Sequence, residues 1–158
     1  MFFGNYEYQL DDKGRIVIPS KLRAELGTTV YLLKGYDGCI SLYTESDFNS
    51  YIENLKNLPF EREKARLHQR ILLGSVEQLN VDKQGRLLIP LKTLKKFNIT
   101  KEVVILGVLD HIEVWNREAY QNYVEDNEEN FEINAEDLLK DANEIWVRWR
   151  TKSASSSR

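Results

Sequence analysis

A stretch of nine residues occurs twice in this chain of 158 residues. Residues 11–19 read DDKGRIVIP and residues 82–90 read DKQGRLLIP, so an aspartate, a glycine, an arginine and a proline recur 71 positions apart. Each copy joins a short polar turn to an alternating apolar run that ends at a proline. This order indicates two copies of one unit. One unit offers about four short strands, too few to close a core alone, so the two units are expected to share one core.

The first unit is predicted to alternate short strands with helices. Aspartate and glycine favour a turn at 11–14, and Pro19 ends the following strand because proline cannot donate to a strand ladder. Ser20 is predicted to be a helix N-cap and Gly27 the helix stop, and an amphipathic helix opens at Thr44. Strands are predicted at 6–10, 15–19, 30–33 and 39–43.

The second unit repeats this order of elements. Strands are predicted at 79–81, 87–90, 103–106 and 112–115, and helices at 91–97 and from Arg117. One extra residue after the short helix shifts the later matches to a spacing of 72, so that Gly35 corresponds to Gly107. Matching apolar positions then imply matching core positions.

The segments outside the two units are predicted to be helical or irregular. A helix over 59–73, with Pro59 in its first turn, links the units. The acidic stretch 127–134 is interpreted as a linker, 135–142 as a last short helix, and 151–158 as a serine-rich disordered tail. The predicted divisions are a first repeat, a linking helix, a second repeat and a C-terminal segment, at 1–58, 59–74, 75–126 and 127–158.

The duplication favours a closed β-structure. A strand left at an open edge invites pairing with another chain, and closing a barrel removes that edge. We therefore expect an α+β fold in which both repeats build one β-barrel with pseudo-twofold symmetry, flanked by helices. The two glycine–arginine turns are then expected at symmetry-related places.

The net charge of −3 is unevenly distributed along the chain. Residues 117–144 hold ten acidic side chains against Arg117 and Lys140, a net charge of −8, whereas residues 145–158 hold four cations. Residues 1–116 are left with a net charge of +1, and their cations gather around the turns and the helix after each turn. The overall sign therefore does not exclude a local surface that binds nucleic acid.

An arginine that follows glycine in an exposed turn suits recognition of phosphate or guanine, because its planar guanidinium bonds two acceptors at once. Lys13 and Lys83 add positive charge beside Arg15 and Arg86. A purely structural alternative is an ion pair between each arginine and the aspartate four residues before it. Duplication preserves turns of both kinds, so both interpretations stay open.

Few residues of the sequence suit an enzyme. His68 and His111 are the only histidines, and both fall in predicted regular structure. Cys39, the single cysteine, lies in an apolar strand, where an inert thiol in a reducing cytosol is expected. The P-loop, GxGxxG and GxSxG motifs are absent, and no signal peptide or membrane span is expected. We therefore predict no catalytic residue, metal site, cofactor or small-molecule substrate.

Several stretches together resemble one known family. DDKGRIVIP followed by SKLR, then RILLG, DKQGRLLIP and TKEVVILG, closely resemble the MraZ family in this order and over residues 1–144. That family is similar to the AbrB-like regulators, whose swapped-hairpin barrel is built from two chains, whereas MraZ proteins carry both halves in one chain. The resemblance implies an AbrB-like swapped-hairpin barrel here.

The resemblance also implies a function. MraZ proteins are bacterial transcriptional regulators that bind short direct repeats in double-stranded DNA upstream of the division and cell-wall gene cluster. They repress that cluster together with their own gene, and they assemble into homo-oligomeric rings. Such a protein is cytoplasmic and associated with the nucleoid. By position, the DNA-contacting residues implied here are Lys13, Arg15, Lys83 and Arg86.

The two copies of the motif differ in their cations. The lysine moves by one position between them, since Lys13 aligns with Gln84. Arg23 aligns with Leu94, so Arg23 is expected to have a role without a counterpart in the second copy. The two turns are therefore expected to contact DNA differently.

Other roles stay open for the rest of the chain. AbrB-like barrels can also be antitoxins, and the acidic C-terminal segment would then be the arm that binds the partner. That segment is otherwise a solvated tail or a subunit-contact helix. Trp146 and Trp149, interleaved with arginines, suit a contact with nucleic acid, a membrane or a neighbouring subunit. The basic helix face at 62–70 suits either solvent or a ring contact.

Overall fold

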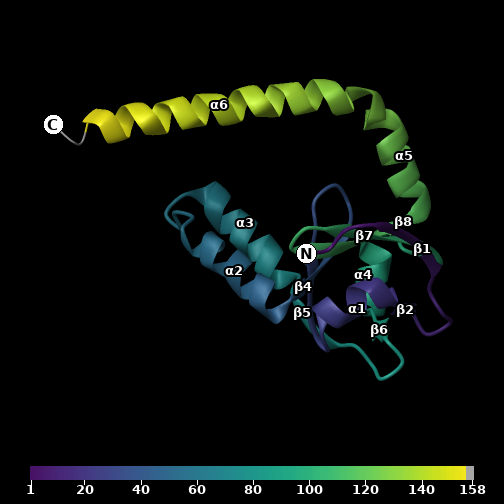
Figure 1. Cartoon of the computed structure of the whole chain (residues 1–158). Coiled ribbons are helices and arrows are strands. Elements are labelled where there is room, and N and C mark those ends of the chain that lie inside the picture. Colours follow the sequence, from purple (N-terminus) through teal and green to yellow (C-terminus); the bar gives the residue numbers. More distant parts are fainter. Residues whose placement is uncertain (156–158) are drawn as a thin grey trace. The chain divides into compact units, whose positions relative to one another are not determined.

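The computed structural model describes residues 1–155, apart from the side chains of Trp149, Ser153 and Ser155. The chain divides into two compact units, Met1–Tyr120 and Gln121–Arg158. The first unit holds both glycine–arginine turns and combines antiparallel strands with helices (Figure 1). The second unit is helical in its described residues.

Both repeats contribute the same series of elements. The strands of the first repeat are β1 (Asn5–Gln9), β2 (Arg15–Val17), β3 (Thr29–Lys34) and β4 (Ile40–Thr44). Those of the second are β5 (Glu77–Asn80), β6 (Arg86–Leu88), β7 (Glu102–Val108) and β8 (His111–Asn116). Short helices α1 (Ser20–Leu26) and α4 (Leu91–Lys96) follow β2 and β6, α2 (Glu45–Lys56) follows β4, and α3 (Glu63–Gly74) links the repeats.

The strand order is symmetric between the repeats. Six antiparallel strands form one sheet in the order β1-β7-β8-β4-β3-β5, and β2 pairs with β6 in a separate two-stranded ribbon. If each strand is replaced by its counterpart in the other repeat, the same strand order is obtained in reverse. The registers agree with this symmetry, since Ile16 lies opposite its own counterpart Leu87, and Ser41 lies opposite Glu113. Strands are thus exchanged, with β1 pairing to the second repeat and β5 to the first.

The sheet does not close into the predicted barrel. Within residues 1–155, β1 and β5 each pair with one strand only, because β2 and β6 pair with each other instead of joining these two edges. Both edge strands are short, at five and four residues, which limits their capacity to pair with another chain. The predicted α+β class and the tandem arrangement are confirmed, whereas the sheet is open.

Apolar residues of both repeats form one core. Ile16 and Leu87 of the ribbon are fully buried with residues of α1, α4 and one face of the six-stranded sheet. Successive residues of a strand point to opposite faces, so Leu32 joins this core while Leu33 packs on the other face. There α2 and α3 lie side by side against β3 and β4, and contribute Leu55 and Leu72 (Figure 1).

The pairing register corrects the predicted match between the hairpins. Tyr8 pairs with Val103, and its counterpart Leu79 pairs with Val30, so β3 and β7 correspond at a spacing of 73 rather than 72. Lys34, not Gly35, therefore corresponds to Gly107. The spacing returns to 72 in β4 and β8, because the loop between β3 and β4 is one residue longer.

Two predicted helix starts are also corrected. Pro19 occupies the N-cap of α1, where its carbonyl accepts the first helical hydrogen bond, so Ser20 is the first helical residue. Pro59 lies in a turn before α3, which begins at Glu63. The N-cap predicted at Thr44 is confirmed, since its hydroxyl accepts the amide of Asp47 at 3.1 Å.

The acidic segment is helical rather than a linker. Helix α5 (Arg117–Asn127) leads through a 3-10 turn at Glu128–Asn130 into α6 (Phe131–Ser155), so 127–134 and 135–142 belong to continuous helical structure. The prediction of disorder at 151–158 is wrong for residues 151–155, because they form the end of α6. Residues 156–158 lie outside the described residues. In the part of the chain that is described, no helix is both long and apolar enough to cross a membrane.

Candidate nucleic-acid interface

The first glycine–arginine turn is closed by Asp11. Its Oδ1 accepts hydrogen bonds from the amides of Lys13 and Arg15, both at 2.9 Å, and its Oδ2 accepts one from Nε of Arg15 at 2.6 Å. Gly14 has φ of +80°, in the left-handed region that favours glycine. The hydrogen bond from the Arg15 amide lowers the pKa of Asp11, so the carboxylate stays charged and holds the turn.

The second turn has the same construction around Asp82. Its Oδ1 accepts the amides of Gln84 and Arg86 at 2.9 and 2.8 Å, and its Oδ2 accepts Nε of Arg86 at 2.8 Å. Gly85 has φ of +75°, and the hydrogen bond from the Arg86 amide lowers the pKa of Asp82. The two turns are therefore equivalent in backbone as well as in sequence.

The predicted ion pairs are confirmed, but they engage only one nitrogen of each guanidinium. Each aspartate binds Nε, and within residues 1–155 no protein group accepts a hydrogen bond from the Nη atoms of Arg15 or Arg86. These two side chains remain 25% and 29% exposed. The aspartates thus orient the arginines while both Nη nitrogens of each are left without a protein acceptor in the described part of the chain. The structural and the binding interpretations of the motif are therefore compatible.

The ribbon brings the two arginines onto one outer face. Arg15 lies opposite Leu88, and Val17 lies opposite Arg86. The two arginines therefore occupy diagonal positions on this face, and two exposed aliphatic side chains take the other two positions. Each turn is also locked to the other repeat, since the amide of Ile18 donates to Gly85 O at 2.8 Å and the amide of Ile89 donates to Gly14 O at 3.2 Å. The two turns form one surface, which we call the ribbon face and define as Lys13, Arg15, Val17, Lys83, Arg86 and Leu88.

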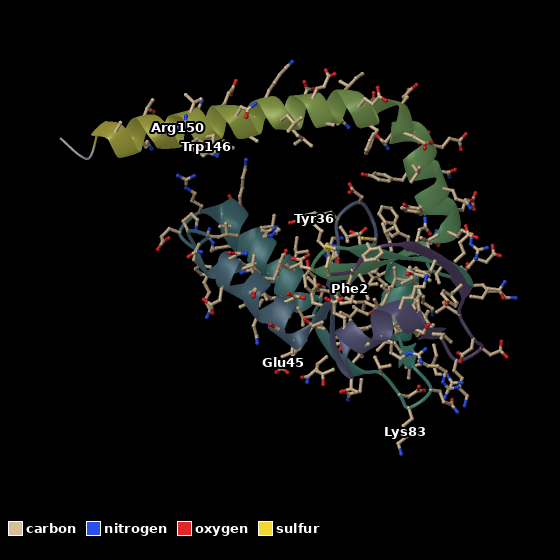
Figure 2. The ribbon with its side chains drawn as sticks, viewed as in Figure 1. Phe2, Tyr36, Glu45, Lys83, Trp146 and Arg150 are labelled. Carbon is tan, nitrogen blue, oxygen red and sulfur yellow. The ribbon has the colours of Figure 1, made fainter. Side chains whose placement is uncertain are left out.

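The two lysines predicted as site residues lie at the tips of the turns. Lys13 and Lys83 are exposed, and Figure 2 shows Lys83 directed away from the rest of the first unit. Lys13 directly precedes the glycine of its turn, whereas Lys83 lies two residues before its glycine, as the alignment of Lys13 with Gln84 predicts. The four predicted residues thus lie on two neighbouring turns, with the arginines oriented by aspartates and the lysines exposed.

The side chain of Arg23 packs against Gly85 of the second turn. Its Nη2 donates to Ile18 O at 2.8 Å, and a Cβ added to Gly85 would lie 2.1 Å from its Cζ. Leu94 takes the equivalent place under Gly14, where its Cδ1 lies 3.1 Å from such a Cβ. Arg23 Nε is buried and, within the described residues, has no hydrogen-bond partner. The sequence difference at this position therefore makes the two turns chemically unequal.

A substitution at Gly85 tests this packing. Gly85→Ala is expected to destabilise the fold by roughly 1 kcal/mol more than Gly38→Ala, because it must also displace Arg23 from its bond to Ile18. Gly38 has φ of +90° with open space around it, so its alanine variant is strained only in its backbone. Urea unfolding of both variants measures the difference. In an Arg23→Ala background the extra loss is expected to vanish, and its persistence would contradict the contact.

The residues weighed for an enzyme form a different cluster. His111 lies between two carboxylates, with Nδ1 2.7 Å from Asp110 Oδ1 and Nε2 3.3 Å from Glu113 Oε2, and its ring stacks on Tyr43. Burial raises the pKa of the neighbouring Cys39 to about 12, as expected for an inert thiol. Among the described residues, no group of three or more histidines, cysteines and carboxylates is arranged to hold a metal ion.

The His111 cluster makes stability depend on pH. Burial disfavours the charged imidazole, but the hydrogen bonds to Glu113 and Asp110 outweigh it and raise the pKa of His111 above 6.5. Because the proton binds the folded state more tightly, its stabilisation is full below 6.5 and is lost as the pH rises through the raised pKa. Urea unfolding should show this decline, and His111→Gln should abolish it. An unchanged pH profile in the variant would contradict the assignment.

A known family matches the chain twice. The model of a family described as "MraZ protein, putative antitoxin-like" matches residues 1–71 and again residues 72–142. The chain belongs to the MraZ family. The two MraZ matches divide at 71/72, which reproduces the 71-residue spacing of the glycine–arginine motifs. The division falls inside α3, and the second MraZ match ends inside α6.

Proposed function

We propose that this MraZ protein is a transcriptional regulator that binds double-stranded DNA through the ribbon face. The observation that carries the proposal is the pair of arginines at equivalent positions of two locked turns, each oriented by an aspartate and each with its Nη donors available. A regulator needs paired contacts at fixed separation, and rigid turns on a shared core supply them.

The shape and chemistry of the ribbon face suit the major groove of DNA. A two-stranded β-ribbon fits this groove, where the guanidinium of arginine can bond O6 and N7 of guanine. Val17 and Leu88, at 40% and 54% exposure, offer apolar contacts for thymine methyl groups. Lys13 and Lys83 at the tips suit the flanking phosphates. We also propose that the fold is a variant of the swapped-hairpin arrangement of AbrB-like proteins, which the exchange of β1 and β5 between the repeats supports.

The wider role rests on the family. The protein represses the division and cell-wall gene cluster and its own gene by binding short direct repeats upstream of it, in the cytoplasm and on the nucleoid. One ribbon face carries few cations, so its affinity is modest and depends strongly on salt. Assembly of several copies into a ring raises the effective concentration at repeated sites and gives avidity. No enzymatic activity is proposed.

Binding to the DNA upstream of the protein's own gene tests this function. Fluorescence anisotropy is expected to show tighter binding to that DNA than to a shuffled duplex of the same length and composition. Equal affinity for both duplexes would exclude sequence recognition. The mass in solution tests the ring separately, because a monomer at working concentration contradicts it.

A second candidate function is that of an antitoxin, which the description of the family favours. The acidic second unit would then be the segment that binds a basic partner, while the ribbon face would still bind DNA. Coexpression with the products of neighbouring genes distinguishes the two. An antitoxin relieves a growth defect caused by one of them, and a pure repressor does not.

A further inference from the structure

The longest helix of the chain carries an exposed apolar stripe. In α6 the apolar residues recur at alternating spacings of four and three, the pattern of a helix that packs along another helix. They are Phe131, Ala135, Leu138, Ala142 and Ile145, flanked by Leu139 and Trp146. Leu138 and Ile145 are each 67% exposed, and large side chains in a continuous stripe mark an interaction surface.

The ends of α6 carry opposite charge. Residues 131–144 hold five acidic side chains against Lys140, a net charge of −4. Residues 145–155 hold Arg148, Arg150 and Lys152 and no acidic residue, a net charge of +3. A second α6 running in the opposite direction would place its basic end against this acidic end. A parallel neighbour would place like charges together along the whole length.

The sizes of the side chains in the stripe favour the same direction. Bulky residues and alanines alternate, since Leu138 and Ile145 are separated by Ala142. In an antiparallel pair centred between 138 and 142, Leu138 meets Ala142 of the second copy, and Ala135 meets Ile145. Each bulky side chain thus fills the space beside a small one. A parallel pair would set alanine against alanine and leave voids, which destabilise packed interfaces.

We propose that the α6 helices of two copies of this chain pair in antiparallel orientation along this stripe. The pairing goes beyond the proposed function, because no residue of α6 belongs to the ribbon face. Its consequence is that two DNA-reading units are tethered to each other. The elbow between α5 and α6 extends the surface, with a hollow of about 840 Å³ whose lining includes Phe131, Leu138, Glu128, Glu129 and Glu132. These carboxylates suit the basic C-terminal end of the second helix.

Thiol crosslinking of the full chain tests both the pairing and its direction. In the proposed pair, residue 139 lies beside residue 139 of the second copy, so Leu139→Cys should crosslink to itself with a bifunctional maleimide of about 10 Å span. Ala135→Cys should not, because its two copies would lie about 15 Å apart along the helix axis at 1.5 Å rise per residue. The natural Cys39 is buried, and the unsubstituted chain serves as its control.

Two matched glutamate variants test whether the contact between the two helices lies along the stripe. Adding Ile145→Glu to Leu139→Cys should lower the crosslinked yield about ten-fold or more, because a carboxylate would be buried in the contact. Adding Val147→Glu should leave the yield unchanged, since Val147 is exposed to a similar extent, at 61%, but lies off the stripe. Circular dichroism checks that both variants keep their helices. Self-crosslinking of Ala135→Cys, absence of crosslinks from Leu139→Cys, or equal effects of the two glutamates would each overturn the proposal.

Discussion

Replacing Arg15 or Arg86 by alanine is expected to weaken binding to the upstream DNA by about 10- to 100-fold each, without unfolding the protein. A good bidentate contact of arginine with a base contributes about 1–3 kcal/mol, and 1.4 kcal/mol is a factor of ten in affinity. The fold should tolerate the change because both side chains are partly exposed and their ion pairs lie at the surface, where such pairs contribute little stability.

The matched control for these variants is Arg62→Ala. It removes the same charge from an exposed residue at the start of α3, which is not part of the ribbon face. Its affinity for the upstream DNA should stay within about two-fold of the wild-type value, as expected for a distant charge under salt screening. Anisotropy titrations compare the three variants, and thermal unfolding confirms that each is folded. An equal loss in Arg62→Ala would mean that only overall charge matters.

The largest expected loss of stability comes from Gly107→Ala. A Cβ at this position would lie 2.3 Å from the backbone nitrogen of Phe3 and 2.8 Å from the carbonyl carbon of Phe2, and backbone cannot swing aside as a long side chain can. The N-terminal residues would have to leave their place beside β7, where the amide of Gly107 donates to Gly4 O at 2.9 Å. Phe2, now 1% exposed, would lose its burial, at a cost of about 3 kcal/mol.

Thermal and urea unfolding measure this loss, with Gly74→Ala as the matched control. No atom lies within 4 Å of a Cβ at Gly74, in the last turn of α3, so that variant should be neutral or up to about 1 kcal/mol more stable. Phe2→Ala should reproduce much of the effect of Gly107→Ala. The double variant should therefore lose less than the sum of the two. Additive losses would show that Gly107 does not act through the N-terminal residues.

The order of the elements in the first unit could be predicted from the sequence because strong local signals mark it. The turns are set by aspartate and glycine, and the strands end at Pro19 and Pro90. The pairing of β2 with β6 and the open edges at β1 and β5 could not, because they depend on which strands meet across the two repeats. The correspondence of Gly107 with Lys34 could not be predicted for a related reason. Glycines in both hairpins suggest a match that only the hydrogen-bonding register corrects.

In the candidate site, the contacts within one turn could also be predicted from the sequence, whereas the contacts between the two repeats could not. Arg15 and Arg86 could be found from the repeated motif, and the aspartates that orient them lie four residues away. The place of Arg23 under Gly85 could not be found, because the two residues belong to different repeats. The alignment of Arg23 with Leu94 is the only sequence signal at this position. It shows that the two copies differ there, but not which residue Arg23 contacts.

Residues 127–134 are helical, whereas the sequence predicts a linker there because their composition outweighs their periodicity. Residues 127–134 are acidic and poor in apolar side chains, which is typical of solvated loops. The alternating spacing of four and three begins at Phe131, inside that stretch, and continues through Ile145. The apolar stripe of an amphipathic helix is narrow and its other faces are polar, so local polarity alone misjudges it.

We propose that the paired arginines read DNA sequence rather than only contact phosphates. The ratio of affinities for the upstream DNA and for the shuffled duplex, measured over a salt series in the double variant Arg15→Lys, Arg86→Lys, tests this proposal. Lysine keeps the charge but loses the planar fork. Binding to the shuffled duplex and its salt slope should change little, while the preference for the upstream DNA should fall by about ten-fold or more. A double lysine variant that keeps the full preference would contradict the proposal.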